Sequence, residues 1–317
     1  MIYLNLTGGL GNQLFQLSAG VNAAQLNDSD LRVEWVLGKP RLDQNGKPEI
    51  SNFFLPSNVT FRKASKSSFF LSKVTGYNLR ARLMPSWIEK SQLFNFFLKI
   101  ITNIIFSLYF RCKCNVLSSK NIGFYPYKIK KFRHYFLIGY FQSYIYAETL
   151  KSINAIQSIK YKYKSVKLDE LFDLAVVENP LIVHIRLGDY RTEHRIGLLS
   201  QLYYSNGIKS QWNSGKYNKI WVFSDEIEKC KHYIPDEYID LVRWIGEVDN
   251  SASATLEAMR YGKGYIIGNS SFSWWGAYLS YTINPQVIHP YPWFSQQEDP
   301  NDLIPSDWIA LHRHELT

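Results

Sequence analysis

The sequence predicts an α/β protein of two domains, each built on a parallel sheet. Short apolar runs of strand length alternate with stretches that can form helices. The chain has 317 residues, enough for two domains, and 46% of them are apolar, enough to fill a core in each. We place the boundary near residue 165, so that residues 1–165 form an N-terminal domain and residues 166–317 a C-terminal domain.

The N-terminal domain opens with a strand, a glycine-rich turn and a helix. IYLNL is followed by TGGLGNQ and then by LFQLSAGVNAAQLN, whose apolar residues have helical spacing. Gly8, Gly9 and Gly11 do not complete the dinucleotide-binding pattern G-x-G-x-x-G, but they let a ligand approach the backbone closely. Asn12 and Gln13 then lie at the start of the helix, where we expect them to face a cleft and bind a sugar or a phosphate.

Further strands are predicted where short apolar runs of five or six residues occur. They are LRVEW (31–35), LIVHIR (181–186), KIWVFS (219–224), LVRWIG (241–246), GYIIG (264–268) and QVIHP (286–290). Because helical stretches separate the last five, we expect a parallel sheet with helices on both faces in the C-terminal domain.

A basic insertion, residues 61–135, interrupts the first domain. It contains fifteen Lys and Arg residues and one acid, Glu89, so its charge is +14 in a chain of net charge +9. The remaining residues therefore sum to −5. Charge that is so concentrated predicts a local patch rather than a protein that binds polyanions over its whole surface.

Within this insertion, residues 93–110 predict an amphipathic helix. Asn95, Lys99, Asn103 and Ser107 are each four residues apart, which forms a narrow polar stripe on an otherwise apolar helix. Two interpretations stay open. The helix is buried against its own domain, or it lies on a membrane surface with flanking Lys and Arg facing anionic lipid. A membrane-spanning helix is disfavoured, because it needs about 20 apolar residues with few or no charges.

The first strand of the second domain ends in His184 and Arg186. Side chains alternate along a strand, so these two lie on the same side, at the carboxyl edge where open α/β sheets bind ligands. An arginine at this edge can bind a phosphate through two parallel hydrogen bonds. The alternative is a buried polar cluster.

Two later strands also end in polar residues. Ser224 and Asp225 follow Val222 and Phe223 at the end of one of them. Asp225 can accept hydrogen bonds from a purine or a ribose. Alternatively, Ser224 or Asp225 caps the next helix. In GNSSFSWWG a helix starts near Phe272, and a helix N-terminus can bind an anion. The candidate phosphate ligands in this motif are Ser270, Ser271 and Ser273.

These motifs, in this order, resemble glycosyltransferase family 11, the α1,2-fucosyltransferases, and its bacterial members in particular. The resemblance rests on GGLGNQLFQ, HIRLGD, FSDE and SSFSWWG and covers nearly all of the chain apart from the basic insertion. It implies a GT-B architecture, in which two Rossmann-like domains face each other across a cleft. It also implies GDP-β-L-fucose as the donor, galactose as the usual acceptor, inversion at the anomeric carbon and no metal requirement.

The same resemblance implies roles for three residues. Arg186 would contact the donor pyrophosphate, with His184 and Asp225 near the nucleoside. The sequence departs from the family at Leu187, where many members carry a second arginine, and this removes a cation near the donor.

Such a reaction needs a group that stabilises the leaving GDP and a base that accepts the acceptor proton. Arg186 together with a helix N-terminus at Ser271 can stabilise the leaving charge without a metal. Asp189, Glu193 and His194 follow the H-x-R strand and are the candidate bases. Asn12 is a further candidate catalytic residue, contributed by the glycine-rich turn.

Other classes of function fit the sequence less well. The D-x-D triplet at 28–30, a pattern of metal-dependent GT-A enzymes, lies between a helix and a strand and is expected to be a surface loop. The pair C-x-C at 112–114 lacks a second ligand pair with zinc spacing, and H-x-H at 312–314 is expected to lie at a mobile terminus, so we expect no metal and no cofactor. A nucleic-acid-binding protein is the alternative from a different class, but its basic region lies outside the cleft motifs. A lectin-like protein without catalysis is a third class.

We therefore expect transfer of L-fucose from GDP-fucose to the 2-hydroxyl of galactose, in the synthesis of O-antigen or a related surface glycan. The alternatives are a fucosyltransferase of another linkage or a transferase of another GDP-sugar. The expected partners are GDP-fucose and a galactose-terminated glycan, either free or lipid-linked, and no nucleic acid. We expect a cytoplasmic protein, either free or peripheral on the inner face of the cytoplasmic membrane, because three cysteines and an N-terminus without leader features do not indicate secretion.

Overall fold

The structure, a computed structural model, forms two compact units. It describes residues 1–63, 113–119, 122–131, 133–152 and 164–313, and six positions between 100 and 108. Unit 1 comprises Met1–Leu42 and Leu55–Ser158, and unit 2 comprises Asp43–Phe54 and Ile159–Thr317. A short segment from the first half of the chain therefore belongs to the second unit, which differs from the two continuous domains expected from the sequence.

Unit 1 is a five-stranded sheet in the order β3-β2-β1-β5-β4, and all its pairings are parallel. The strands are β1 (Ile2–Gly8), β2 (Leu31–Pro40), β3 (Val59–Arg62), β4 (Cys114–Ser118) and β5 (His134–Ile138), and the helices are α1 (Leu10–Asn27) and α6 (Tyr144–Ser152). The sheet packs closely on α1, because a Cβ on Gly20 would meet Leu4 and Leu31 at 3.0–3.1 Å. Asp28 ends α1 in a left-handed conformation and is exposed, so the D-x-D triplet begins at an exposed helix end, as expected for a surface loop.

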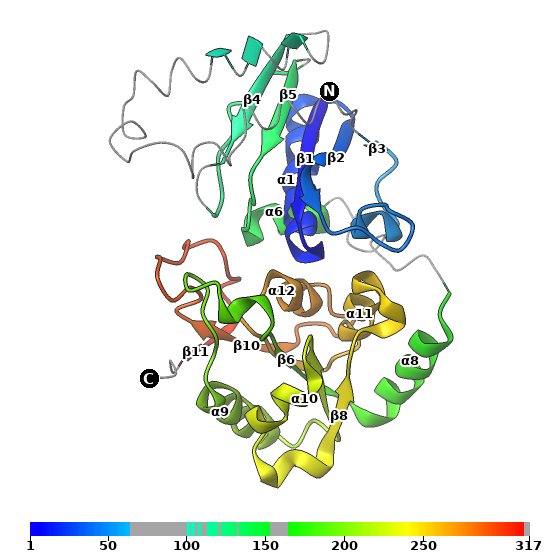
Figure 1. Cartoon of the computed structure of the whole chain (residues 1–317), viewed down its shortest axis with the longest axis vertical. Coiled ribbons are helices and arrows are strands. Elements are labelled where there is room, and N and C mark those ends of the chain that lie inside the picture. The colour runs from blue at the N-terminus through cyan, green and yellow to red at the C-terminus, as the bar shows by residue number, and fades with distance from the viewer. Residues whose placement is uncertain are drawn as a thin grey trace. The chain divides into compact units, whose positions relative to one another are not determined.

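Unit 2 is a six-stranded parallel sheet in the order β11-β10-β9-β6-β7-β8. Figure 1 labels β6, β8, β10 and β11 of this sheet. Its strands are β6 (Leu181–Ile185), β7 (Ile220–Ser224), β8 (Val242–Ile245), β9 (Gly264–Ile266), β10 (Gln286–Tyr291) and β11 (Ile309–His312). Its α-helices are α8 (Val166–Glu178), α9 (Gln201–Trp212), α10 (Ile227–Cys230), α11 (Ala252–Met259) and α12 (Ser271–Tyr278). The five apolar runs predicted as strands in this half form β6 to β10.

The core of unit 2 forms because the central strands are apolar on both faces. Leu181, Val183 and Ile185 lie on one face of β6 and are fully buried in a cluster with Tyr203 and Ile208 of α9, and Ile182 on the other face is fully buried as well. Helices on both faces of the sheet explain why these strands read as continuous apolar runs rather than as alternating ones.

The strand orders place one switch point in each sheet. In unit 2 the chain starts at β6, adds β7 and β8 on one side, and then crosses to β9 on the other side. In unit 1 it starts at β1, adds β2 and β3, and later places β5 against the other side of β1. Ligands of such sheets bind beyond the carboxyl ends of the two strands that flank the switch point. The fold therefore predicts ligand sites beyond the carboxyl ends of β6 and β9 in unit 2, and beyond those of β1 and β5 in unit 1.

The segment Asp43–Phe54 is held in unit 2 by a buried carboxylate. Glu49, in a 3-10 turn (Glu49–Asn52), accepts hydrogen bonds from the backbone N–H of Ser253 at 3.3 Å and from its hydroxyl at 3.1 Å. Asn52 donates to the same hydroxyl at 3.0 Å. Ser253 lies in the first turn of α11, where a negative charge is stabilised by the helix dipole.

Most of the basic insertion lies outside the described residues, including 64–99. The predicted helix 93–110 is therefore described only at six positions, all of them helical. Within the described part of the chain, no helix is both long enough and apolar enough to cross a membrane.

Candidate functional site

His184 and Arg186 lie at the end of β6, beside the switch point of unit 2. His184 is 5% exposed, and its ring lies 6.0 Å from that of Phe272 in α12. Gly268, at the end of β9, allows this packing, because a Cβ there would meet the His184 carbonyl oxygen at 3.1 Å. Burial, with a smaller effect of Arg186, lowers the pKa of His184 to about 3, so the ring is neutral. Its Nδ1 is buried and makes no hydrogen bond within the described residues.

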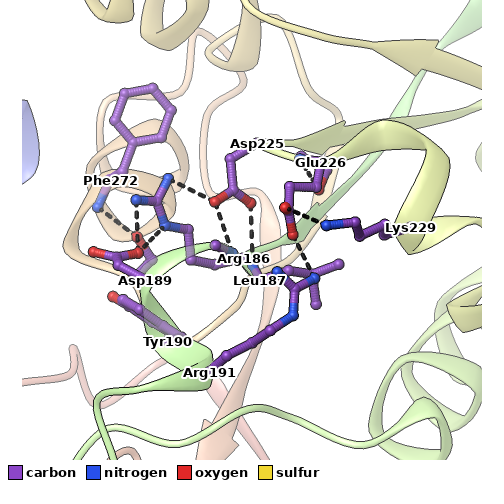
Figure 2. Close-up of polar contacts among 12 residues, drawn as sticks. Arg186, Leu187, Asp189, Tyr190, Arg191, Asp225, Glu226, Lys229 and Phe272 are labelled. Atoms are coloured by element: carbon purple, nitrogen blue, oxygen red, sulfur yellow. Dashed lines mark hydrogen bonds and ion pairs between the residues drawn. The ribbon is translucent and has the colours of Figure 1, made fainter.

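The Arg186 guanidinium is held between two carboxylates (Figure 2). Its Nη2 lies 2.8 Å and its Nε 3.0 Å from Oδ1 of Asp189, and its Nη1 lies 3.2 Å from Oδ2 of Asp225. The ring of Tyr190 lies 5.8 Å from the guanidinium carbon. The arginine side chain is 29% exposed, so the positive charge is fixed in place and still open to solvent.

Asp225, at the end of β7, shapes the loop that follows Arg186. Its two carboxylate oxygens accept the backbone N–H groups of Leu187 and Gly188, both at 3.0 Å, in addition to the Arg186 ion pair. A Cβ on Gly188 would lie only 2.5 Å from Oδ2 of Asp225, so this contact requires glycine. The structure shows Asp225 binding this loop, whereas the N-cap of α10 is Glu226. A contact between Asp225 and a nucleoside stays a prediction. The Leu187 side chain is buried in the core of unit 2.

The first turn of α12 lies next to this cluster, as Figure 2 shows for Phe272 and Arg186. Ser270 is the N-cap, and its hydroxyl accepts the Phe272 N–H at 3.3 Å. Ser271 is the first helical residue and is partly exposed. Ser273 is fully buried and donates to the Gly268 and Ser270 carbonyls at 3.3 and 3.2 Å. Ser273 is therefore corrected from phosphate ligand to a residue that holds the turn.

The loop after β6 is also anchored at its far end. Asn269 donates from its side chain to the carbonyls of Ile196 at 3.0 Å and Gly197 at 2.9 Å, and its own carbonyl accepts the Tyr190 hydroxyl at 3.4 Å. Burial raises the pKa of Tyr190 to about 12, so this hydroxyl stays a donor. The buried Arg313 donates to the Ile196 carbonyl at 2.9 Å. Asn269 and Arg313 were not singled out from the sequence, because the loop carbonyls that their side chains bind are distant along the chain.

The three candidate bases differ in their contacts. Asp189, in a 3-10 turn (Asp189–Arg191), binds Arg186 directly. Glu193 accepts the Arg195 side chain at 3.0 Å, and this hydrogen bond lowers its pKa, whereas the His194 carbonyl accepts the Ser295 hydroxyl. Among the three, the described contacts bring only Asp189 to Arg186.

A second ion-pair cluster holds the start of the same loop. Arg191 binds Glu226, which also binds Lys229 at 2.9 Å (Figure 2). The hydrogen bond from Arg191, with a further one from Lys229, lowers the pKa of Glu226 to about 2. Ser224, the last residue of β7, accepts the Glu226 N–H at 3.1 Å and so holds the turn after this strand.

The switch point of unit 1 carries the glycine-rich turn. Gly8 has a φ of +73°, and a Cβ on it would meet Nδ2 of Asn12 at 2.7 Å. Gly9 is the N-cap of α1, and Gly11 is a buried residue of its first turn. Oδ1 of Asn12 accepts Nε2 of Gln142 at 2.7 Å, which joins the loops after β1 and β5.

Gln13 has a different role from the one expected of it. Its side chain is buried and donates to the carbonyls of Gly8 at 3.1 Å and Arg41 at 2.9 Å. Gln16 likewise accepts the Thr7 N–H and donates to the Gly139 carbonyl, both at 3.0 Å. The two glutamines hold the turn through these hydrogen bonds. Of the two residues predicted to bind a ligand there, Asn12 is partly exposed and Gln13 is buried.

In the described part of the chain, no three His, Cys, Asp or Glu side chains gather as metal ligands would. Cys112 and His314, each half of a pair considered above, lie outside it.

Comparison with known proteins places this geometry in a family. The profile of glycosyl transferase family 11 matches residues 1–312. The chain belongs to glycosyl transferase family 11. The profile match extends over both units.

Two curated relatives from Escherichia coli resemble this family 11 chain over nearly their whole length. An α-1,2-colitosyltransferase is 28% identical over 329 aligned positions, which cover 99% of each chain. The O-antigen biosynthesis glycosyltransferase WbnK is 26% identical, over 98% of this chain and 100% of its own.

A solved structure supports the fold. The fucosyltransferase NodZ from Bradyrhizobium aligns over 94% of this chain and 98% of its own, with 12% identity and a TM-score of 0.50. Two doubly wound α/β units in one family 11 chain are the GT-B architecture that the sequence predicted.

Proposed function

We propose that this family 11 enzyme transfers L-fucose from GDP-β-L-fucose to the 2-hydroxyl of a galactose acceptor, with inversion, in O-antigen or related surface-glycan synthesis. The assignment of a GDP-sugar donor rests on the Arg186 guanidinium. Asp189 and Asp225 fix this group at the switch point of unit 2, next to the first turn of α12. The linkage and the pathway are supported by the α-1,2-colitosyltransferase and the O-antigen enzyme that the chain resembles.

The site suits a diphosphate leaving group. Breaking the bond between the sugar and the phosphate places negative charge on GDP, and groups aimed in advance at that charge lower the barrier. Arg186 cannot reorient freely, because two carboxylates hold it, so little reorganisation is needed when the charge develops. The N-terminus of α12 contributes the positive end of a helix dipole beside it.

The acceptor hydroxyl must lose its proton as it attacks the anomeric carbon from the opposite face. Asp189, Glu193 and His194 remain the candidate proton acceptors. Glu193 is ionised near neutral pH, because the hydrogen bond from Arg195 lowers its pKa. Asp189 has the closest connection to the donor side, through Arg186.

GDP-colitose is a second candidate donor. The 28% identity to an α-1,2-colitosyltransferase favours it. Colitose lacks the 3-hydroxyl of fucose, so a pocket with a hydrogen-bond partner for that hydroxyl would discriminate strongly between the two sugars, whereas a pocket without one would accept both.

The test is a panel of GDP-sugar donors with simple galactosides, with the linkage of each product determined by NMR. We expect the highest kcat/KM with GDP-fucose and a product fucosylated at the 2-hydroxyl of galactose. A higher kcat/KM with GDP-colitose would replace the donor assignment, and a product linked at another hydroxyl would overturn the linkage.

A further inference from the structure

An apolar ridge in the basic insertion faces outward from unit 1. The described positions between 100 and 108 are helical. They are Ile100, Ile101, Asn103, Ile104, Ser107 and Leu108.

The polar side of this helical segment is turned toward the protein. Oδ1 of Asn103 accepts the Val116 N–H at 2.8 Å, and the Ser107 hydroxyl accepts the Cys114 N–H at 2.9 Å. Both N–H groups belong to β4, which is the edge strand of its sheet. The two side chains thus pair backbone groups that an edge strand would otherwise leave exposed. The polar stripe predicted from the sequence therefore faces the sheet at these two positions.

The apolar side is consequently turned toward solvent. Ile101, Ile104 and Leu108 are 53%, 55% and 74% exposed, and their spacing of i, i+3 and i+7 places them on one face of a helix. Ile100, at 40%, extends this ridge. A surface helix of a globular protein usually buries such a face, so an exposed one indicates an interaction surface.

Positive charge borders the ridge. Lys113 immediately precedes β4 and Arg133 immediately precedes β5, and the first residues of these strands, Cys114 and His134, are register partners. Lys113 and Arg133 are exposed, and the insertion as a whole carries +14. The acids Asp28 and Asp30 precede β2, which pairs with the opposite side of β1 from β5.

We propose that this surface binds an anionic membrane, with Ile101, Ile104 and Leu108 inserted at the boundary between headgroups and acyl chains. Apolar side chains flanked by lysine and arginine match the chemistry of such an interface, in which lipid phosphates meet the cations and acyl chains meet the ridge. A second copy of this chain fits less well, because the contact would bring two insertions of charge +14 together. The inference does not depend on which sugar the enzyme transfers.

The experiment is flotation of the full chain with vesicles of phosphatidylcholine alone or with 30 mol% phosphatidylglycerol. We compare the native protein with an Ile104→Glu/Leu108→Glu variant. Ile283→Glu is the matched control, because Ile283 is 88% exposed and lies in unit 2. We expect binding to the anionic vesicles that weakens with salt. Each of the two ridge substitutions should weaken vesicle binding by at least about tenfold. The control should bind as the native protein does.

Unchanged melting temperature and donor hydrolysis in the ridge variant exclude a folding defect. The proposal is overturned if the native protein binds neither type of vesicle, or if the ridge variant binds as well as the native protein. It is also overturned if sedimentation velocity shows dimers that the ridge substitutions abolish while vesicle binding is absent, since a second copy then covers the ridge.

Discussion

Gly188 is the residue whose side chain, a single hydrogen, most directly determines the geometry around Arg186. Any Cβ would push against the Asp225 carboxylate, which holds the Leu187 and Gly188 N–H groups and the guanidinium together. The loop and the arginine are therefore positioned by one carboxylate.

Gly188→Ala should displace that carboxylate and misplace Arg186. We expect kcat/KM to fall roughly 100-fold, the scale on which a misplacement of about 1 Å affects catalysis. Gly246→Ala is the control, because a Cβ there meets nothing within 4 Å. Steady-state kinetics on both variants test this, and native kinetics for a folded Gly188→Ala would show that the loop does not need Asp225.

His184 should make the protein sensitive to acid. The folded state keeps it neutral, with a pKa of about 3, whereas the unfolded imidazole takes up a proton below its ordinary pKa of 6.5. Unfolding therefore binds a proton in this window. The stabilising contribution is complete above pH 6.5 and is lost as the pH falls toward 3, at up to about 1.4 kcal/mol per pH unit.

Urea unfolding of His184→Gln between pH 7 and 5 measures this slope. The variant should lose less stability per pH unit than the native protein, whereas His232→Gln, at an exposed position, should keep the native slope. Equal slopes for the native protein and His184→Gln would mean that the ring is not held neutral by burial.

At the scale of elements, two structures that are distant in sequence form one site because they end at the same sheet edge. The loop after β6 carries Arg186, and the turn after β9 carries the N-terminus of α12. Asn269 joins them through hydrogen bonds to Ile196, Gly197 and Tyr190.

Asn269→Ala should loosen this junction without touching the donor phosphates. We expect kcat/KM to fall about 10- to 100-fold with a smaller change in GDP affinity, because orientation is lost more than binding. Asn213→Ala, at the exposed C-cap of α9, serves as the control. Equal losses of GDP affinity and of kcat/KM would instead place Asn269 in direct contact with the nucleotide.

The sequence predicts the elements that a local pattern specifies, and it does not predict those that depend on contacts between residues distant along the chain. The strands of unit 2 are apolar runs, and the proximity of Arg186 to Asp225 follows because neighbouring parallel strands end at one edge. The placement of Asp43–Phe54 in unit 2 depends on Glu49 and Ser253, which are 204 residues apart, and no local pattern reports such a contact. Ser270 and Ser273 look equivalent in sequence, but one caps the helix and the other lies buried within it.

At the scale of the whole molecule, we expect the protein itself to stabilise the charge on the leaving group. Arg186 and the helix N-terminus can supply this stabilisation, so we expect activity to persist in excess EDTA. A purified enzyme assayed with GDP-fucose and a galactoside, with and without EDTA, tests this. Loss of activity beyond tenfold that Mn²⁺ or Mg²⁺ restores would show that a metal carries this role.

The central claim is that Arg186 stabilises the charge that grows on the leaving diphosphate. Turnover, GDP affinity and melting temperature should be measured on the native protein, Arg186→Lys and Arg186→Ala. Both variants should fold and lose about 100- to 1000-fold in kcat, more than they lose in GDP affinity, because lysine keeps the charge but not the planar group that Asp189 and Asp225 hold. Near-native turnover in a stably folded Arg186→Ala would contradict the account.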